Sequence, residues 1–169
     1  HTNLNKKFNY VKKVKSLETT KKYFNDSKSL SAIELKEFSF LYLLMNNLDL
    51  MRENLQLIEN VHLFTEVNKQ IFSKIMSKLR LREKLTIKDL EIDEQLIEKI
   101  NKFASIKYIL GKKNKNEHEI IGLLDDINRD LNNYHLELRI QDLESKFSKD
   151  LSETTFNELK ELKKKQNIN

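Results

Sequence analysis

The 169-residue sequence has no cysteine, no proline and no tryptophan, and its only glycines are Gly111 and Gly122. Without cysteine the chain can form no disulfide, no zinc site with thiolate ligands and no thiol nucleophile. So few turn-forming residues argue against a β-sandwich, a β-barrel or a glycine-rich phosphate loop. No apolar run approaches the ~18 residues that a membrane span needs. The remaining composition, rich in Leu, Ile, Lys, Glu and Asn, predicts an all-α protein with no membrane span.

The formal charge of +5 is unevenly distributed along the chain. Residues 1–28 hold eight lysines and two acidic residues, whereas residues 117–169 hold eight basic and twelve acidic residues. Clustered lysines release counterions from phosphates, so the basic segment favours nucleic-acid binding as one hypothesis. The sequence starts at His1 without a methionine or a signal pattern. We therefore interpret the chain as a piece of a longer protein, with residues 1–28 as a linker.

Residues 29–116 predict a helical bundle. Ser31 and Glu34 have the spacing of a capping box at a helix start. The run 33–45 is apolar on nearly every side, which indicates a helix at the centre of the bundle. Shorter helices are expected at 48–58 (capped by Asn46-Asn47), 66–79, 86–90, 93–103 and 106–110. The second of these should bury one stripe, formed by Val67, Ile71, Phe72, Ile75 and Leu79.

The segment from Glu117 to Ser148 contains no helix breaker, and about 32 residues of helix would span about 50 Å. Its apolar residues form two stripes. The first is Ile120, Leu124, Ile127, Leu131, Tyr134 and Leu138, and the second is Leu136, Ile140, Leu143 and Phe147. Leu138 and Ile140 are about 200° apart around a helix, so the buried face changes side in mid-helix. One half can pack on the bundle, and the other half needs a different partner.

A terminal helix supplies part of that partner. Residues 148–150 predict a tight connection, Ser152 can cap the next helix, and Phe156 begins its apolar face. Three lysines, 163–165, lie in its last turn, where cations complement the helix dipole. Residues 117–169 should therefore form a long helix and a C-terminal hairpin. Because two helices cannot bury both of their apolar seams, this hairpin should keep exposed apolar surface for docking.

No set of residues predicts catalysis, a cofactor or a bound metal. The internal histidines His62, His118 and His135 have no metal-binding spacing. Three aspartates of the long helix lie within about one turn of each other, at Asp125, Asp126 and Asp130. We interpret them as solvent-facing residues of a charged helix, and we expect the chain to be non-catalytic.

The order of elements and several leucine-rich segments carry a resemblance to a known family. The segments are Asn46-Asn47-Leu48-Asp49-Leu50, Phe64 before Ile71-Phe72-Ser73-Lys74-Ile75, the run from Leu136 to Leu143, Leu151-Ser152-Glu153, and Leu159-Lys160-Glu161-Leu162. Together these resemble the C-terminal helicase-binding domain of bacterial replicative primase, the DnaG-type enzyme, over roughly residues 29–166. The amino-terminal domain of DnaB-type helicase has a similar fold, and the terminal hairpin favours primase.

The resemblance implies that the hairpin docks on the amino-terminal domains of the hexameric DnaB-type helicase and recruits RNA-primer synthesis to the replication fork. It implies a monomeric, cytoplasmic fragment, with zinc and magnesium confined to other domains of the parent primase. The residues expected to maintain the hairpin and contact the helicase are Leu143, Phe147, Leu151, Phe156, Leu159, Leu162, Lys163 and Gln166. The pattern does not separate outward anchors from inward packing, and Phe147 and Phe156 fit either role.

Two alternative functions remain open at this stage. The chain could be a basic helical domain that binds DNA or RNA through residues 6–28, in which case binding should weaken steeply with salt. It could also be the helical amino-terminal domain of the helicase itself, in which case it should self-associate.

Overall fold

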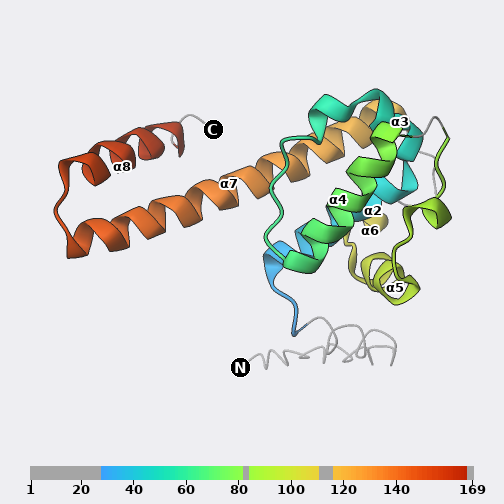
Figure 1. The fold of residues 1–169 in the computed structure, drawn as a ribbon, viewed down its shortest axis with the longest axis horizontal. Helices are drawn as coiled ribbons and strands as arrows, with labels where there is room; N and C mark the ends of the chain where they lie inside the picture. Colours follow the sequence, from blue (N-terminus) through green and yellow to red (C-terminus); the bar gives the residue numbers. More distant parts are fainter. Residues whose placement is uncertain (1–27, 82–83, 111–115, 167–169) are drawn as a thin grey trace, which may run out of the picture. The chain divides into compact units, whose positions relative to one another are not determined.

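The computed structural model describes residues 28–81, 84–110 and 116–166. Within these ranges it contains helices and no strand, which confirms the all-α prediction (Figure 1). The chain divides into two units after Leu30, and the description below concerns the unit that begins at Ser31. The hypothesis of nucleic-acid binding concerns residues 6–28, and all of these except Lys28 lie outside the described residues. None of the described helices combines the length and hydropathy that crossing a membrane requires.

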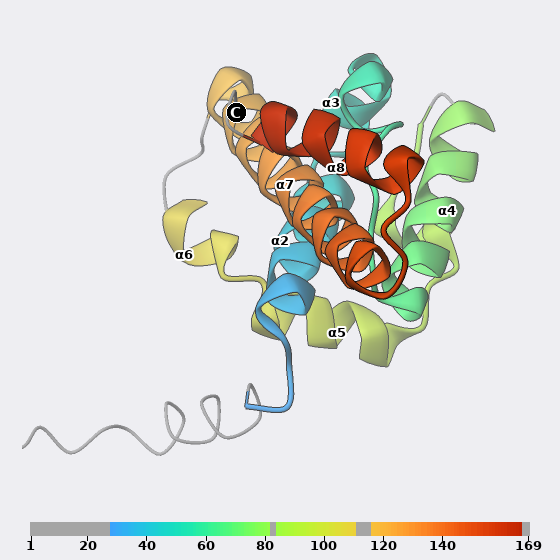
Figure 2. The same cartoon turned by 90° about the vertical axis from the view of Figure 1, so that its left-hand side faces the viewer.

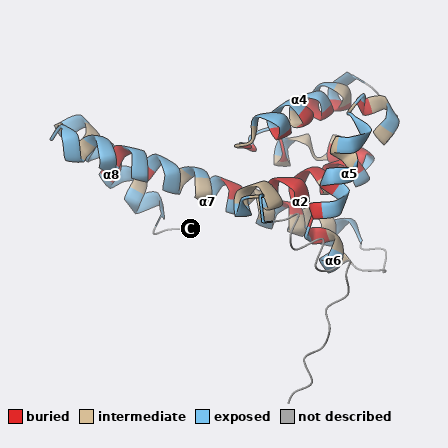
Figure 3. Cartoon of the chain, turned by 90° about the horizontal axis from the view of Figure 1, so that it is seen from below, coloured by how far each residue is buried: buried red, intermediate tan, exposed pale blue. Residues whose placement is uncertain are grey.

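Helix α2 (Ala32–Asn46) is the central element of the bundle. The backbone N–H of Glu34 donates to Oγ of Ser31 at 3.2 Å, so Ser31 is the N-cap, as predicted. The buried residues of α2 lie on all its sides: Glu37, Phe38, Ser39, Phe40, Leu41, Leu43, Leu44 and Met45. Helices α4 (Glu66–Leu81), α5 (Glu94–Phe103) and α7 (Glu117–Lys149) all pack against it (Figures 2 and 3). The all-round apolar pattern thus correctly predicted the centre of the bundle.

The elements around α2 are mostly short, and the prediction of one helix over 48–58 is wrong. Helix α3 (Leu48–Glu53) ends at Asn54, whose side-chain amide donates to the carbonyl of Leu50 at 2.8 Å. A separate 3-10 turn, η1 (Leu55–Leu57), follows. Asn47 occupies the N-cap position of α3 without a side-chain cap bond, and its side-chain amide donates to the Leu43 carbonyl at the end of α2. The asparagines thus divide the segment by bonding to the preceding turn.

The remaining short helices follow the sequence more closely. The 3-10 turn η2 (Ile87–Leu90) has a capping box between Thr86 and Asp89. Asp93 caps α5, as predicted, by accepting from the backbone N–H groups of Gln95 and Leu96. A single turn, α6 (Ile106–Leu110), completes the bundle.

A buried carboxylate joins α2 to the start of α4. Glu37 has no exposed surface, and its Oε1 accepts from the backbone N–H groups of Phe64 and Thr65, the latter at 3.1 Å. Its Oε2 accepts from the side-chain amide of Asn68 at 2.7 Å. Asn68 therefore occupies the buried position at the start of α4, while Val67 is 45% exposed. The predicted apolar stripe of α4 was wrong at Val67 for this reason.

Helix α7 is one continuous helix of 33 residues, capped by Asn116, whose Oδ1 accepts from the Glu119 N–H at 2.9 Å. Its first half packs on α2, where Leu124 and Leu131 are fully buried. Its second half extends beyond the bundle and packs on α8 (Glu153–Gln166), as Figure 1 shows. The long helix thus belongs both to the bundle and to the hairpin.

Replacing Glu37 with methionine should destabilise the bundle, because the buried donors of Phe64, Thr65 and Asn68 lose their acceptor. We expect Glu37→Met to lower the free energy of unfolding by about 3 kcal/mol. The matched substitution at exposed Glu98, Glu98→Met, should change the free energy of unfolding by less than about 0.5 kcal/mol. Urea unfolding followed by circular dichroism measures both, and equal effects of the two substitutions would contradict this role of Glu37.

Candidate protein-binding hairpin

The α7–α8 hairpin has an apolar core of its own. Ile140 and Leu143 of α7 and Leu159 of α8 are each 9% exposed or less, and Leu136 and Leu162 pack against them. These α7 residues are those of the second predicted stripe. Leu138, the last member of the first stripe, is 38% exposed. The predicted change of buried face along α7 is therefore confirmed.

The connection between the two helices is tight and has polar caps. The backbone N–H of Asp150 donates to the Lys146 carbonyl at 2.9 Å, which ends α7. Oγ of Ser152 accepts from the N–H of Thr155 at 3.5 Å, a cap at the start of α8. Between these caps, Leu151 is 80% exposed at the tip of the hairpin.

Two ion pairs cross from α7 to α8. Arg139 donates to Oε1 of Glu158 at 2.6 Å, and Lys163 lies 2.6 Å from Oε1 of Glu144. The hydrogen bond to Glu158, together with its negative charge, raises the pKa of Arg139 above its ordinary value. Exposed pairs of this kind stabilise little in water. Their main effect is to favour one register of α8 on α7.

Pairs along each helix influence two further carboxyl groups. The hydrogen bond from Lys146 lowers the pKa of Asp142 below its ordinary value. The hydrogen bond from Lys164 likewise lowers the pKa of Glu161. Both carboxylates therefore stay ionised to a lower pH than they would without their lysine partners.

The eight residues predicted for hairpin integrity and partner contact divide into two groups. Leu143 and Leu159 lie in the hairpin core, with Leu162 packed against it. Phe147 is half-buried, and its ring centroid is 5.7 Å from that of Phe156. The leucine contacts form the hairpin core, and Phe147 and Phe156 pack on each other outside it.

The other group faces solvent. Leu151 is the most exposed, Phe156 is 48% exposed in spite of its contact with Phe147, and Gln166 ends α8 on the surface. Lys163 projects from α8 with its ammonium group on Glu144. Contact with a partner remains a prediction for this group. Sequence reasoning missed Arg139, Glu144 and Glu158, because pairs 19 residues apart become visible only once the hairpin register is known.

A hollow of about 600 Å³ lies where α7 leaves the bundle, and the sequence did not predict it. Its lining includes His62, Phe64, His135 and Arg139. The two imidazole rings are 5.4 Å apart, and Phe64 packs edge-on against Tyr134 at 5.0 Å. This hollow is lined by residues of the bundle and of the middle of α7.

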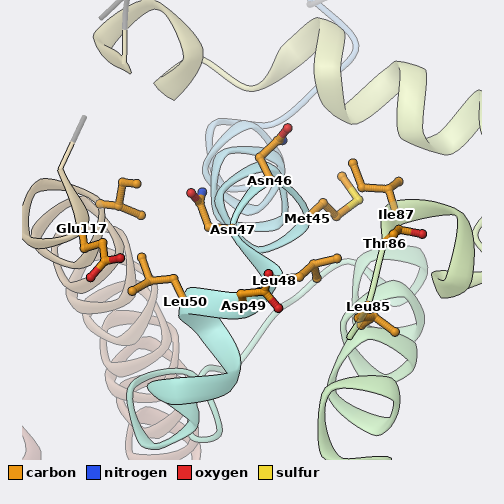
Figure 4. Close-up of a pocket in the computed structure, with 11 residues that line it drawn as sticks. Met45, Asn46, Asn47, Leu48, Asp49, Leu50, Leu85, Thr86, Ile87 and Glu117 are labelled. Carbon is orange, nitrogen blue, oxygen red and sulfur yellow. The ribbon is translucent and has the colours of Figure 1, made fainter. Parts of the chain in front are cut away.

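Another hollow, shown in Figure 4, lies where α2 ends and α7 begins. Met45, Leu48 and Ile87 supply apolar lining, and Asn46 and Asn47 lie beside them. The amide groups of both asparagines donate to carbonyls of α2 at 2.8 Å.

The three aspartates of α7 are not gathered into a site. Asp130 pairs with Lys36 at 2.6 Å, Asp126 pairs with Arg129, and Asp125 is exposed. In the part of the chain that the structure describes, no three His, Asp or Glu side chains come together as ligands of a metal ion.

Comparisons with known proteins found no relative of this chain. No protein-family model matches the chain, and neither a curated protein nor a solved structure was found to match it.

Shortening Leu159 should open the hairpin and leave the bundle intact, because Leu159 is the buried contribution of α8 to the hairpin core. We expect Leu159→Ala to lower the free energy of hairpin opening by about 2–4 kcal/mol, as measured at the backbone amides of the hairpin. The same substitution at exposed Leu151 should change it by less than about 0.5 kcal/mol. Native-state hydrogen exchange measures both. Loss of protection throughout α2 in Leu159→Ala would show that the two parts unfold together.

Removing the ammonium group of Lys146 should raise the pKa of Asp142 towards its ordinary value of 3.8. In the wild type, a lowered pKa stabilises the fold above that value, and the contribution is lost as the pH falls through the folded pKa. Lys146→Gln should therefore make the helix content of the hairpin less sensitive to acid. Carboxyl ¹³C shifts measured against pH follow the titration. Lys164→Gln is the control, since it should move the pKa of Glu161 and not that of Asp142.

Proposed function

We propose that this chain is the helicase-interaction domain of a bacterial DNA primase. In this role it docks on the amino-terminal domains of the hexameric DnaB-type replicative helicase and brings RNA-primer synthesis to the fork. The chain does no chemistry of its own, and the zinc- and magnesium-dependent steps belong to other domains of the parent primase. The observation that supports this best is a helical hairpin with its own core, extended beyond the bundle, with apolar side chains left exposed.

The exposed side chains suit a docking role. Leu151 lies at the tip and Phe156 on the first turns of α8, where neither is covered by the bundle. Partly exposed aromatic residues are preferred anchors in protein interfaces. Because the hairpin core is filled by Leu143 and Leu159, such an anchor can contact a partner without unfolding the hairpin.

Mixing the full chain with the hexameric helicase should give a complex that co-sediments at tens of micromolar. Phe156→Ala should weaken binding by about tenfold or more, because it removes an aromatic anchor and keeps the hairpin core. The matched control is Tyr108→Ala, since Tyr108 is an exposed aromatic residue of α6, on the bundle. Analytical ultracentrifugation and biolayer interferometry measure the complex.

Three results would overturn this proposal. The first is the absence of co-sedimentation, and the second is an equal loss of binding in Tyr108→Ala and Phe156→Ala. The third is a chain that binds single-stranded DNA instead of helicase and loses that binding when residues 1–28 are removed. Self-association without helicase would favour the helicase amino-terminal domain.

A further inference from the structure

An open hollow of about 440 Å³ lies along one flank of α8, beside the contact of α8 with α7. It is lined by Phe156, Leu159, Lys160, Lys163 and Lys164. These positions follow one another at helical spacing, so they form one face of α8. Phe156 and the edge of Leu159 provide an apolar floor, and the lysines form its rim. The five lining residues include no acidic side chain.

The charge around this hollow is only partly compensated. Lys163 pairs with Glu144 and Lys164 pairs with Glu161, each through a single contact. Lys160 has no ion-pair partner among residues 28–81, 84–110 and 116–166. Two carboxylates of α8 lie near Lys160 in the sequence: Glu161 is bonded to Lys164, and Glu158 is bonded to Arg139. The rim of the hollow therefore presents net positive charge to solvent.

We propose that this hollow binds an acidic amphipathic helix of the partner protein. An apolar side chain of that helix fills the space between Phe156 and the lysine stems, whose methylene groups extend the apolar floor. Its carboxylates face the ammonium groups of Lys160, Lys163 and Lys164. Charge complementarity selects this occupant, because the rim is basic and the floor is apolar. The inference rests on the proposed function and adds the chemistry of the surface that the hairpin recognises.

The lysines of the rim and the apolar anchor Phe156 should affect different steps of binding. Rim charges act mainly on the rate of association and on its dependence on salt. An apolar anchor acts mainly on the rate of dissociation. Lys160→Glu should therefore slow association by about tenfold at low salt and reduce its salt dependence. Phe156→Ala should speed dissociation and leave the salt dependence nearly unchanged.

The experiment uses the full chain and two probes. One probe is the amino-terminal domain of the replicative helicase. The other is a synthetic helical peptide with leucines on one face and glutamates on the other, paired with a control peptide in which glutamine replaces every glutamate. Lys160→Glu is compared with Lys88→Glu, which makes the same change of net charge at an exposed lysine of η2. Circular dichroism verifies the fold, and interferometry at several NaCl concentrations gives the rates.

A loss of peptide binding in Lys160→Glu but not in Lys88→Glu identifies the hollow as the binding site. The glutamate peptide should bind the wild type and Lys88→Glu alike, bind Lys160→Glu about tenfold more slowly, and outcompete the glutamine peptide. Equal binding of the two peptides, or equal effects of the two substitutions, would overturn the inference. It would also be overturned if a single-stranded oligothymidine bound through Lys160 as tightly as the glutamate peptide does.

The helicase probe separates this inference from the proposed function. If the helicase domain binds the wild type and Lys160→Glu at the same rate, the recruitment role stands and the acidic-helix inference falls. If the glutamate peptide binds through Lys160 and the helicase domain does not bind at all, the hollow stands and the proposed partner falls.

Discussion

The change of buried face along α7 is the constraint on which the rest of this structure depends. A helix of 33 residues is stiff, and the bundle covers only its first half, through Leu124 and Leu131. The second half presents Ile140 and Leu143 on another side, so those side chains need a cover that the bundle cannot supply. Helix α8 is that cover. It packs on α7, and Phe156 and the lysines beside it remain exposed to solvent.

The bundle has a core and polar contacts that are separate from those of the hairpin. Helix α2 is buried on all sides, and Glu37 fixes the entry to α4 through backbone donors far from it in the sequence. No side-chain polar atom that is buried in the described part of the chain lacks a hydrogen-bond partner. Changes in the two parts should therefore add independently, since distant sites that share no partner do so. Such independence allows the hairpin to vary its surface without weakening the bundle.

Sequence patterns correctly predicted those features that depend on residues close together in the sequence. The caps at Ser31 and Asp93 depend on neighbouring backbone, and the two stripes of α7 depend on helical periodicity. The error over 48–58 also has a local cause, the side-chain bond from Asn54 to Leu50, but the error at Val67 has a distant one. Val67 is exposed because Asn68 bonds to Glu37, 31 residues away. For the candidate site, apolar spacing predicted a hairpin but not the rotation of α8, and that rotation determines that Leu159 is buried while Phe156 is half exposed.

The balance between apolar and charged surface on α8 bears on how such a hairpin would bind. Its exposed apolar area is small, essentially one aromatic ring with lysine stems around it, and burial of that area alone would give weak association. The lysine rim adds long-range attraction, which raises the rate of encounter more than the lifetime of the complex. A surface of this kind favours contacts that form quickly and dissociate readily.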